Sequence, residues 1–233
     1  MIGLTIGCAL ACAVLVVAEW RRLAGLRIGA KLVASAAFVA AGVSAVAAQG
    51  GDLAASRVQL GYAFVAALAL GAIGDACLLV TGKRWFLAGL VAFLLGHLAY
   101  IAGIARIEPW GRWPGDAGWL LAVPAGLGIA ALAHLWPRLG ALRVPVIAYV
   151  ATITVMVIAA IGAARGPALP GGGGRLVAGA SAFFASDLAV ARERFVARSF
   201  TNKLWGLPAY YAGQLLLAWS IAAIDMASTG AGP

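Results

Sequence analysis

Ionisable side chains are scarce in this chain. Only 11% of the 233 residues are charged, eight residues are acidic, and there are two histidines and three cysteines. The mean hydropathy is +0.98 and 64% of the residues are hydrophobic. A soluble domain carries far more charge, so this composition is typical of a helical membrane protein. The hydrophobic runs are continuous rather than alternating, which disfavours a transmembrane β-barrel.

The few histidines and cysteines exclude further classes of site. With His97 and His134 as its histidines, the chain cannot form a three-histidine zinc site. All three cysteines lie inside apolar runs, so the sequence predicts no disulfide framework. We expect no cofactor and no metal ion, although a mixed site of Asp and His ligands stays open. The N-terminus lacks the basic start of a cleavable signal, and we expect a retained first helix.

Eight apolar runs are long enough to cross a bilayer as helices, which takes about 20 residues each. They cover residues 2–18, 32–48, 60–80, 85–104, 118–135, 142–163, 176–191 and 205–226. We therefore expect an all-α polytopic membrane protein, in which residues 1–233 form one domain, a bundle of eight transmembrane helices. Asp75 and His97 flank one basic link, and Asp187 and Tyr210 flank another at similar spacing. This spacing fits a weak 4+4 internal repeat.

The basic residues indicate an orientation in the membrane. Twelve of the 17 Lys and Arg residues fall in the first, third, fifth and seventh expected loops, and five fall in the others. Cytoplasmic loops are enriched in Lys and Arg, so these loops are predicted to face the cytoplasm and both termini to lie outside. The formal charge of +9 is then a topology signal, and we expect no nucleic-acid partner.

Three ionisable residues interrupt the apolar runs. Asp75 and His97 lie in the third and fourth expected spans, and Ser186 precedes Asp187 in the seventh. An ionisable side chain at such depth costs roughly 2.5–3.5 kcal/mol on insertion scales, so it usually faces the bundle interior or a water-filled cavity. The rise of about 1.5 Å per residue places all three in the cytoplasmic half. One cavity between four helices would collect them.

Structural roles are the alternative for each residue. Asp75 could pair with Arg84, and Asp187 with Arg192, while Ser186 could bond back to its own helix. A Ser-His-Asp esterase built from Ser186, His97 and Asp75 is disfavoured, because Ser186 lies in mid-helix and no nucleophile elbow surrounds it.

The polar positions also occur in a familiar order. The residues concerned are Gly74, Asp75, Leu78, Leu79, Gly89, Phe93, His97, Tyr100, Tyr149, Met156, Ser186, Asp187, Phe195, Tyr210, Tyr211 and Gln214. From the third span onward the chain resembles the YhhN-type lysoplasmalogenases, while the first two spans are generic. The resemblance implies a membrane hydrolase that cleaves the vinyl-ether bond of lysoplasmalogens to a fatty aldehyde and a glycerophospho-base.

Vinyl-ether hydrolysis suits the residues. The β-carbon must be protonated by an acid, and a carboxylate must balance the resulting oxocarbenium ion and activate water, as in glycosidases. We expect Asp75 and Asp187 to be this pair, in either order, with His97 orienting one of them or the water. The expected substrate-binding residues are Tyr100, Ser186, Tyr210, Tyr211 and Gln214 in the spans, and Arg198 and Lys203 for the head-group phosphate.

The expected partners are an alkenyl lysophospholipid, entering from the inner leaflet, and the surrounding membrane lipids.

If both carboxylates are unpaired, Asp75→Asn and Asp187→Asn should fold at least as stably as the parent, since an amide is cheaper to bury. The alternative function is a transporter of a lipid or small molecule, in which the buried Asp and His residues relay protons or bind the substrate.

Overall fold

The computed structural model describes residues 1–48, 56–166, 169 and 173–229, and every regular element within them is helical. The long helices are α1 (Ile2–Arg21), α2 (Ala24–Ala47), α3 (Ser56–Leu79), α4 (Lys83–Ile107), α6 (Ala122–Leu135), α7 (Arg143–Arg165), α8 (Gly174–Ala191) and α9 (Phe200–Thr229). Short helical pieces are η1 (Trp110–Arg112), α5 (Trp113–Ala117), η2 (Gly118–Leu121), η3 (Trp136–Arg138), η4 (Gly140–Leu142) and η5 (Arg192–Val196). The predicted all-α class is confirmed. A helix satisfies its own backbone hydrogen bonds, as a lipid environment requires.

The number of spans needs one correction. In the described part of the chain, seven helices are long and apolar enough to cross a membrane, rather than the eight expected. The expected span that is not among these seven covers residues 205–226 of α9, and its side chains from residue 223 onward lie outside the described part of the chain. Helix α9 packs against α8, α2, α1 and α3. The chain is an integral multi-pass membrane protein.

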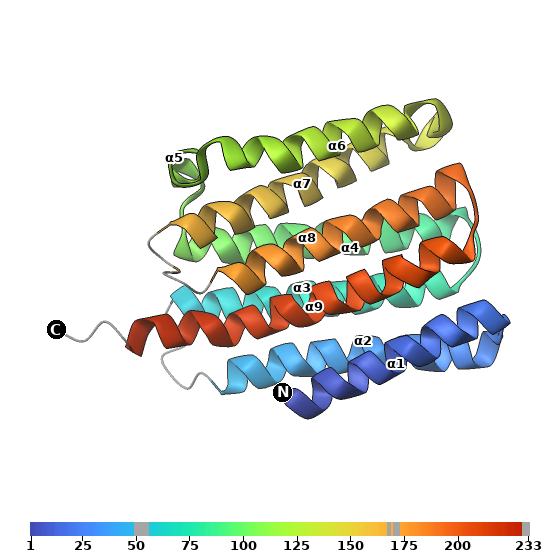
Figure 1. Cartoon of the computed structure of the whole chain (residues 1–233), viewed down its shortest axis with the longest axis horizontal. Helices are drawn as coiled ribbons and strands as arrows, with labels where there is room; N and C mark the ends of the chain where they lie inside the picture. The colour runs from blue at the N-terminus through green and yellow to red at the C-terminus, as the bar shows by residue number, and fades with distance from the viewer. Residues whose placement is uncertain (49–55, 167–168, 170–172, 230–233) are drawn as a thin grey trace.

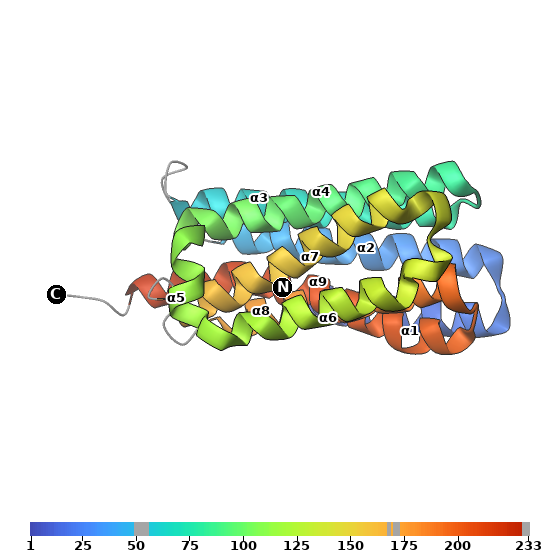
Figure 2. The same cartoon turned by 90° about the horizontal axis from the view of Figure 1, so that it is seen from above.

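The long helices lie side by side as a bundle (Figures 1 and 2). In Figure 1, α1 and α2 form its lower edge and α6 and α7 its upper edge, with α3, α4, α8 and α9 between them. The connections α1–α2, α3–α4, α6–α7 and α8–α9 all lie at the right-hand end. This is the end at which the positive-inside count places the cytoplasm; both termini outside the cytoplasm remain a prediction, and residues 230–233 lie outside the described part.

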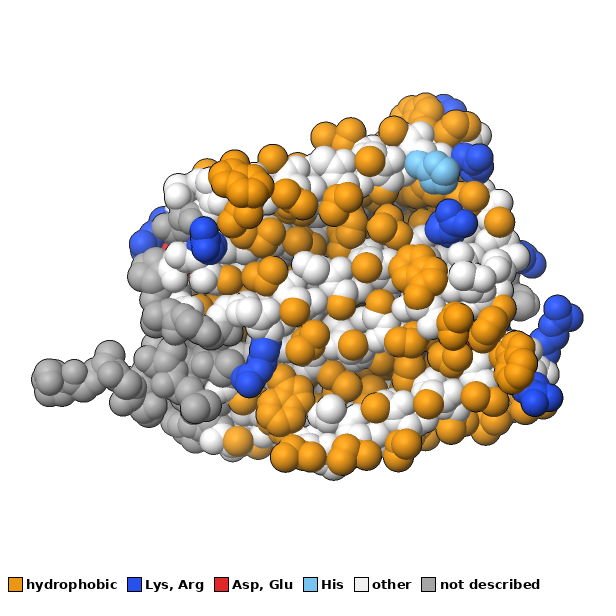
Figure 3. Space-filling model, viewed as in Figure 1, with side chains coloured by type: hydrophobic (Ala, Val, Ile, Leu, Met, Phe, Trp, Pro, Cys, Tyr) orange, Lys and Arg blue, Asp and Glu red, His pale blue; other side chains and the backbone are white. Residues whose placement is uncertain are grey.

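The outer surface fits this arrangement. Hydrophobic side chains are spread along the whole bundle on the face seen in Figure 3, and Lys and Arg gather toward its ends. Exposed apolar residues recur along the outward faces of the helices, among them Ile6, Leu10, Val91 and Ile129. Such a surface would aggregate in water, whereas lipid tails are as apolar as these side chains and can cover them.

Helix α2 begins earlier than its apolar run suggests. The expected second span starts at residue 32, but α1 ends at Arg21, its C-cap Arg22 is in the left-handed conformation with φ 58°, and α2 begins at Ala24. Arg27 and Lys31 therefore belong to the first two turns of a helix and not to a loop. The position of this helix boundary decides which side chains of α2 contact Asp75.

Glycines bring the helices of the site together. At the crossing of α8 and α9, a Cβ on Gly213 would lie 3.0 Å from the backbone oxygen of Gly179. A Cβ on Gly71 of α3 would collide with the amide of Gln214. Without these side chains the backbones approach closely, as small residues allow in membrane proteins. The polar groups of α9 thus reach α3 and α8.

Candidate active site

A cavity of about 390 Å³ lies between the helices, and its charged lining residues come from the end of the bundle where α1 connects to α2 and α8 to α9, on the right in Figure 1. It is lined at its mouth by charged residues from α1, α2, η5, the link that follows η5, and α9: Glu19, Arg27, Glu193, Arg194, Arg198 and Lys203. Further in, apolar residues of α3, α4, α6, α7 and α8 form the wall, including Leu78, Leu90, Phe93, Leu135, Val150 and Phe184. Asp75 and Asp187 both line this one cavity, as do Tyr149, Ser186 and Tyr210.

Asp75 lies one turn before the end of α3, and its side chain is only 2% exposed. Lys31 Nζ lies 2.6 Å from Asp75 Oδ1, and Ser35 Oγ donates a hydrogen bond of 2.6 Å to Oδ2. Lys31 and Ser35 are four residues apart on α2, so they share one helix face. An ammonium and a hydroxyl that both donate to a carboxylate stabilise its charged form. The partner of Asp75 is thus Lys31 and not Arg84.

Asp187 on α8 has different neighbours. The hydroxyl of Tyr149, on α7, donates to Asp187 Oδ2 at 2.7 Å, and His97 Nε2 lies 3.1 Å from the same hydroxyl. His97 Nε2 is 3.6 Å from Asp187 Oδ2, and the Asp187 side chain is 18% exposed. Because the Tyr149 hydroxyl proton is used for Asp187, its oxygen must accept from His97, which assigns the proton of that imidazole to Nε2. Asp187 therefore pairs with Tyr149 and His97 and not with Arg192.

The second ring nitrogen of His97 completes this picture. His97 is fully buried, and its Nδ1 has no hydrogen-bond partner in the part of the chain that the structure describes. Buried imidazole nitrogens are normally paired, so an orphan one is unusual. The direction of the hydrogen bonds runs from His97 through Tyr149 to Asp187, which is the layout of a proton relay.

Three predicted binding residues form a separate chain of hydrogen bonds. Tyr100 on α4 donates to Gln214 Oε1 at 2.8 Å, and Gln214 Nε2 donates to the Tyr210 hydroxyl at 3.2 Å. Tyr100 and Gln214 are fully buried, and only Tyr210 lines the cavity. Tyr100 and Gln214, which do not line the cavity, thus fix the position of the Tyr210 hydroxyl.

Aromatic rings lie between the two aspartates. Phe183 packs edge-on against Tyr210 with ring centroids 5.2 Å apart, and against His97 at 4.7 Å. Phe93 contacts both Phe183 and Tyr210 at about 6 Å. These contacts fix the positions of the aromatic rings that separate the neighbours of Asp75 from the neighbours of Asp187.

The remaining predicted residues take different places. Ser186 lines the cavity, but its hydroxyl donates to the Phe183 backbone oxygen at 2.7 Å. This is the structural alternative expected for Ser186. A hydroxyl bound in this way is not arranged to act as a nucleophile. Tyr211 is 2% exposed and packs against Tyr210 and Phe38 instead of lining the cavity. Arg198 and Lys203 line the mouth of the cavity.

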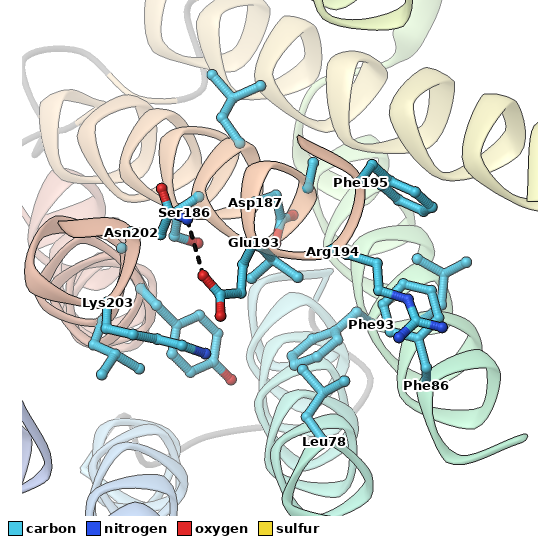
Figure 4. Close-up of a pocket in the computed structure, with 18 of the residues that line it drawn as sticks. Leu78, Phe86, Phe93, Ser186, Asp187, Glu193, Arg194, Phe195, Asn202 and Lys203 are labelled. Atoms are coloured by element: carbon cyan, nitrogen blue, oxygen red, sulfur yellow. Dashed lines mark hydrogen bonds between the residues drawn. The ribbon is translucent and has the colours of Figure 1, made fainter. Parts of the chain in front are cut away.

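Figure 4 shows how the mouth is built. Glu193 points into the pocket and accepts a hydrogen bond of 2.9 Å from Asn202 Nδ2, and the Ser199 backbone N–H donates to the same carboxylate at 3.0 Å. The Arg194 guanidinium stacks over Phe86, 4.5 Å from the ring centroid. The single turn of π-helix at η5 belongs to this rim, and such turns are frequent at functional sites.

The sequence alone does not predict two residues of the site, Lys31 and Ser35. A third, Tyr149, belongs to the family resemblance but is not among the predicted site residues. A lysine seven residues inside a helix start, facing an intramembrane aspartate, would have been the signal for the first. Among the described residues, no group of three or more His, Cys, Asp and Glu side chains is placed to hold a metal ion.

Comparison with known proteins adds to this geometry. The profile of the YhhN family matches residues 26–221. The chain belongs to the YhhN family. The lysoplasmalogenase of Mycobacterium bovis (strain ATCC BAA-935 / AF2122/97) is 32% identical over 162 residues, 66% of this chain and 58% of that protein. Lysoplasmalogenase TMEM86A of Bos taurus is 32% identical over 174 residues, 71% of this chain and 65% of that protein.

The family resemblance seen in the sequence is therefore confirmed. The match spans less than two thirds of the length of these curated relatives. No solved structure matches this chain significantly.

Proposed function

We propose that this chain is a membrane hydrolase that cleaves the vinyl-ether bond of lysoplasmalogens, releasing a fatty aldehyde and a glycerophospho-base. The observation that carries the proposal is one cavity with two aspartates in different surroundings, an apolar wall and a basic mouth. Two relatives are named lysoplasmalogenase, which supports the same reaction for this chain.

The amphipathic cavity suits a single-chain lipid. Leu135 of α6 and Val146 and Val150 of α7 offer an apolar surface to the alkenyl chain, while Arg198 and Lys203 at the mouth can bind the phosphate. With the mouth on the cytoplasmic side, the lipid enters from the inner leaflet. This orientation follows from the distribution of Lys and Arg.

The first chemical step needs a proton on carbon. Asp187 is the donor in this proposal, because its neighbours Tyr149 and His97 can supply a proton along the relay. Within the described part of the chain, a protonated His97 is the one cation at ion-pair distance from it. Transfer of that proton to the β-carbon of the enol ether leaves an oxocarbenium ion at the α-carbon. Acid–base assistance of this kind typically contributes about 10²–10⁴-fold to a rate.

The second step needs a base. Water adds to the α-carbon while its proton passes to Asp75, whose carboxylate also balances the cation. The hemiacetal then collapses: its hydroxyl loses a proton to the Asp187 carboxylate, the C–O bond to glycerol breaks, and the leaving oxygen takes the proton that Asp75 received from water. Both carboxyl groups return to their initial states and one water is consumed.

The test is turnover by the purified protein in detergent, with alkenyl, alkyl and acyl lysophospholipids of the same head group and chain length. We expect aldehyde from the alkenyl lipid alone, and in heavy water one deuterium at carbon 2 of that aldehyde. Turnover in detergent would also exclude the transporter alternative as a sufficient explanation, since transport needs two compartments. Absence of turnover on all three lipids, with substrate uptake by reconstituted vesicles, would contradict the proposal.

A further inference from the structure

Lys31 has no role in the reaction as written, yet it is built into the cavity. It lies on α2, two turns after the helix begins, and its side chain is only 12% exposed. Its Nζ atom contacts Asp75 and its side chain lines the cavity. An ammonium in such surroundings is costly to desolvate, and a buried ion pair is on balance often no more stable than an apolar pair of the same shape. Fold stability alone therefore does not account for this lysine.

Among the described residues, the other groups that interact with Asp75 carry no positive charge. Cys8 and Cys12 approach the Lys31–Asp75 pair from α1, and Tyr210 and Tyr211 face Asp75 from α9. Thiols and phenols are neutral when protonated, and Ser35 offers only a neutral hydroxyl. Among these neighbours the positive charge comes from Lys31.

We propose that Lys31 is a positioning residue that keeps Asp75 in its carboxylate form and in a fixed orientation toward the cavity. This inference rests on the proposed function and divides its acid–base work: Asp75 accepts the proton of the attacking water, and Asp187 donates the proton to carbon. Lys31 keeps its own proton throughout. Of the lone pairs that a carboxylate offers, Lys31 and Ser35 occupy one on each oxygen, so others remain for a water molecule in the cavity.

The experiment compares three variants of the full chain in detergent with an alkenyl lysophospholipid as substrate. Lys31→Met removes the charge and keeps the length, Lys31→Arg keeps the charge, and Lys83→Met removes an exposed lysine that begins α4 at the same end of the bundle. The quantities measured are kcat, KM and the dependence of kcat/KM on pH.

We expect Lys31→Met to lower kcat by roughly 100-fold, within the usual range for lost acid–base assistance. KM should change little, and the acid limb of the rate profile should move to higher pH, because an Asp75 without its cation takes up a proton more easily. Lys31→Arg should recover most of kcat and the parental profile. Lys83→Met should match the parent. A merely structural Lys31 would lower the yield or thermal midpoint but leave the pH profile in place.

A second measurement does not depend on activity and covers the case that Lys31→Met fails to fold. The infrared spectrum of the parent protein at neutral pH is compared with that of Asp75→Asn. We expect both spectra to show the same protonated-carboxyl bands, because Asp75 is ionised in the parent protein. A protonated-carboxyl band that is present in the parent and absent from Asp75→Asn would overturn the role of Lys31, and so would a parental kcat and pH profile in Lys31→Met. Absence of vinyl-ether hydrolysis by the parent protein would instead refute the proposed function and leave the infrared result to decide the charge state.

Discussion

The surroundings of Asp75 and Asp187 differ although both residues line one cavity. Asp75 is almost covered, with an ammonium and a hydroxyl from α2 on its two oxygens. Asp187 is partly open to the cavity and receives the hydroxyl of Tyr149, behind which lies a fully buried His97. The first arrangement stabilises a charge, and the second can carry a proton.

This difference predicts that Asp75 and Asp187, although of one residue type, take different chemical roles because their neighbours differ. Lysozyme follows the same rule, since the environments of its two active-site carboxyl groups decide which of them stays protonated. Here the neighbours of Asp75 come from α2 and α9, and those of Asp187 from α4 and α7. The four predictions that follow test the comparison between the two sites, from the largest expected effect to the smallest.

Asp75→Asn should affect both activity and stability. Vinyl-ether hydrolysis should fall by at least about 100-fold, because an amide cannot accept the proton of water. The substitution also leaves the Lys31 ammonium buried without its counter-charge, and breaking a buried ion pair costs about 3–5 kcal/mol of folding free energy. This corrects the expectation, made on the assumption of an unpaired carboxylate, that Asn at this position would stabilise the fold.

Thermal midpoints and initial rates, measured on the same preparations, check this prediction. The matched control is the double variant Lys31→Met with Asp75→Asn, which removes both charges. Its midpoint should recover while its activity stays low. A midpoint of Asp75→Asn equal to that of the parent would show that the contact between Lys31 and Asp75 contributes nothing to stability.

Asp187→Asn should affect activity alone. The loss should again be at least about 100-fold, because an amide donates no proton to carbon. The thermal midpoint should stay near that of the parent, since the Asn oxygen can still accept the hydrogen bond of Tyr149 and no cation is left unpaired. A fall in midpoint as large as that of Asp75→Asn would remove the proposed difference between the two sites.

Tyr149→Phe tests the relay with a smaller change. The substitution removes the hydroxyl that lies between His97 and Asp187 and leaves the ring in place. Asp187 becomes a carboxylate as it gives its proton to carbon, and a hydrogen bond to a charged group contributes about 1.5–3 kcal/mol, so a loss of roughly 10- to 100-fold in kcat is expected. His97→Gln should also lose less than Asp187→Asn. Tyr62→Phe, at an exposed tyrosine of α3, is the control; equal rates for Tyr149→Phe and this control would exclude the relay.

Arg198→Gln should give the smallest effect. Arg198 is exposed at the mouth, and exposed ion pairs contribute about 0.2–1 kcal/mol. We expect KM for the lysophospholipid to rise up to about five-fold with kcat unchanged, and the difference to shrink at high salt. A large fall in kcat would mean that Arg198 acts on the reacting groups and not on the head group.

Much of this site could be predicted from the sequence. Asp75, Asp187 and His97 were expected to converge because an ionisable residue in an apolar run must face a cavity or a partner. The membrane fold followed from composition, and most helix boundaries agree to within a few residues with the apolar runs. These features are local in the sequence, so one chain reveals them.

The partners of the aspartates could not be derived in the same way. The sequence predicts a loop at Lys31, because the apolar run of the second span begins only after it, whereas α2 begins at Ala24. In a loop, the charge of Lys31 indicates only the topology of the chain. Tyr149 lies 38 residues from Asp187 and Ser35 lies 40 residues from Asp75. Only the packing of α2 on α3 and of α7 on α8 brings such pairs together.

The division of roles is tested most directly by chemical rescue with formate. Asp75→Ala and Asp187→Ala each leave space for this small anion in a cavity that opens beside Arg198 and Lys203. Formate is ionised at neutral pH, so it can bind the vacated Lys31 ammonium and accept a proton from water, but it cannot donate one to carbon. We predict that formate raises the rate of Asp75→Ala in proportion to its concentration and leaves Asp187→Ala unchanged. Rescue of Asp187→Ala without rescue of Asp75→Ala would contradict the assignment of Asp75 as base and Asp187 as acid.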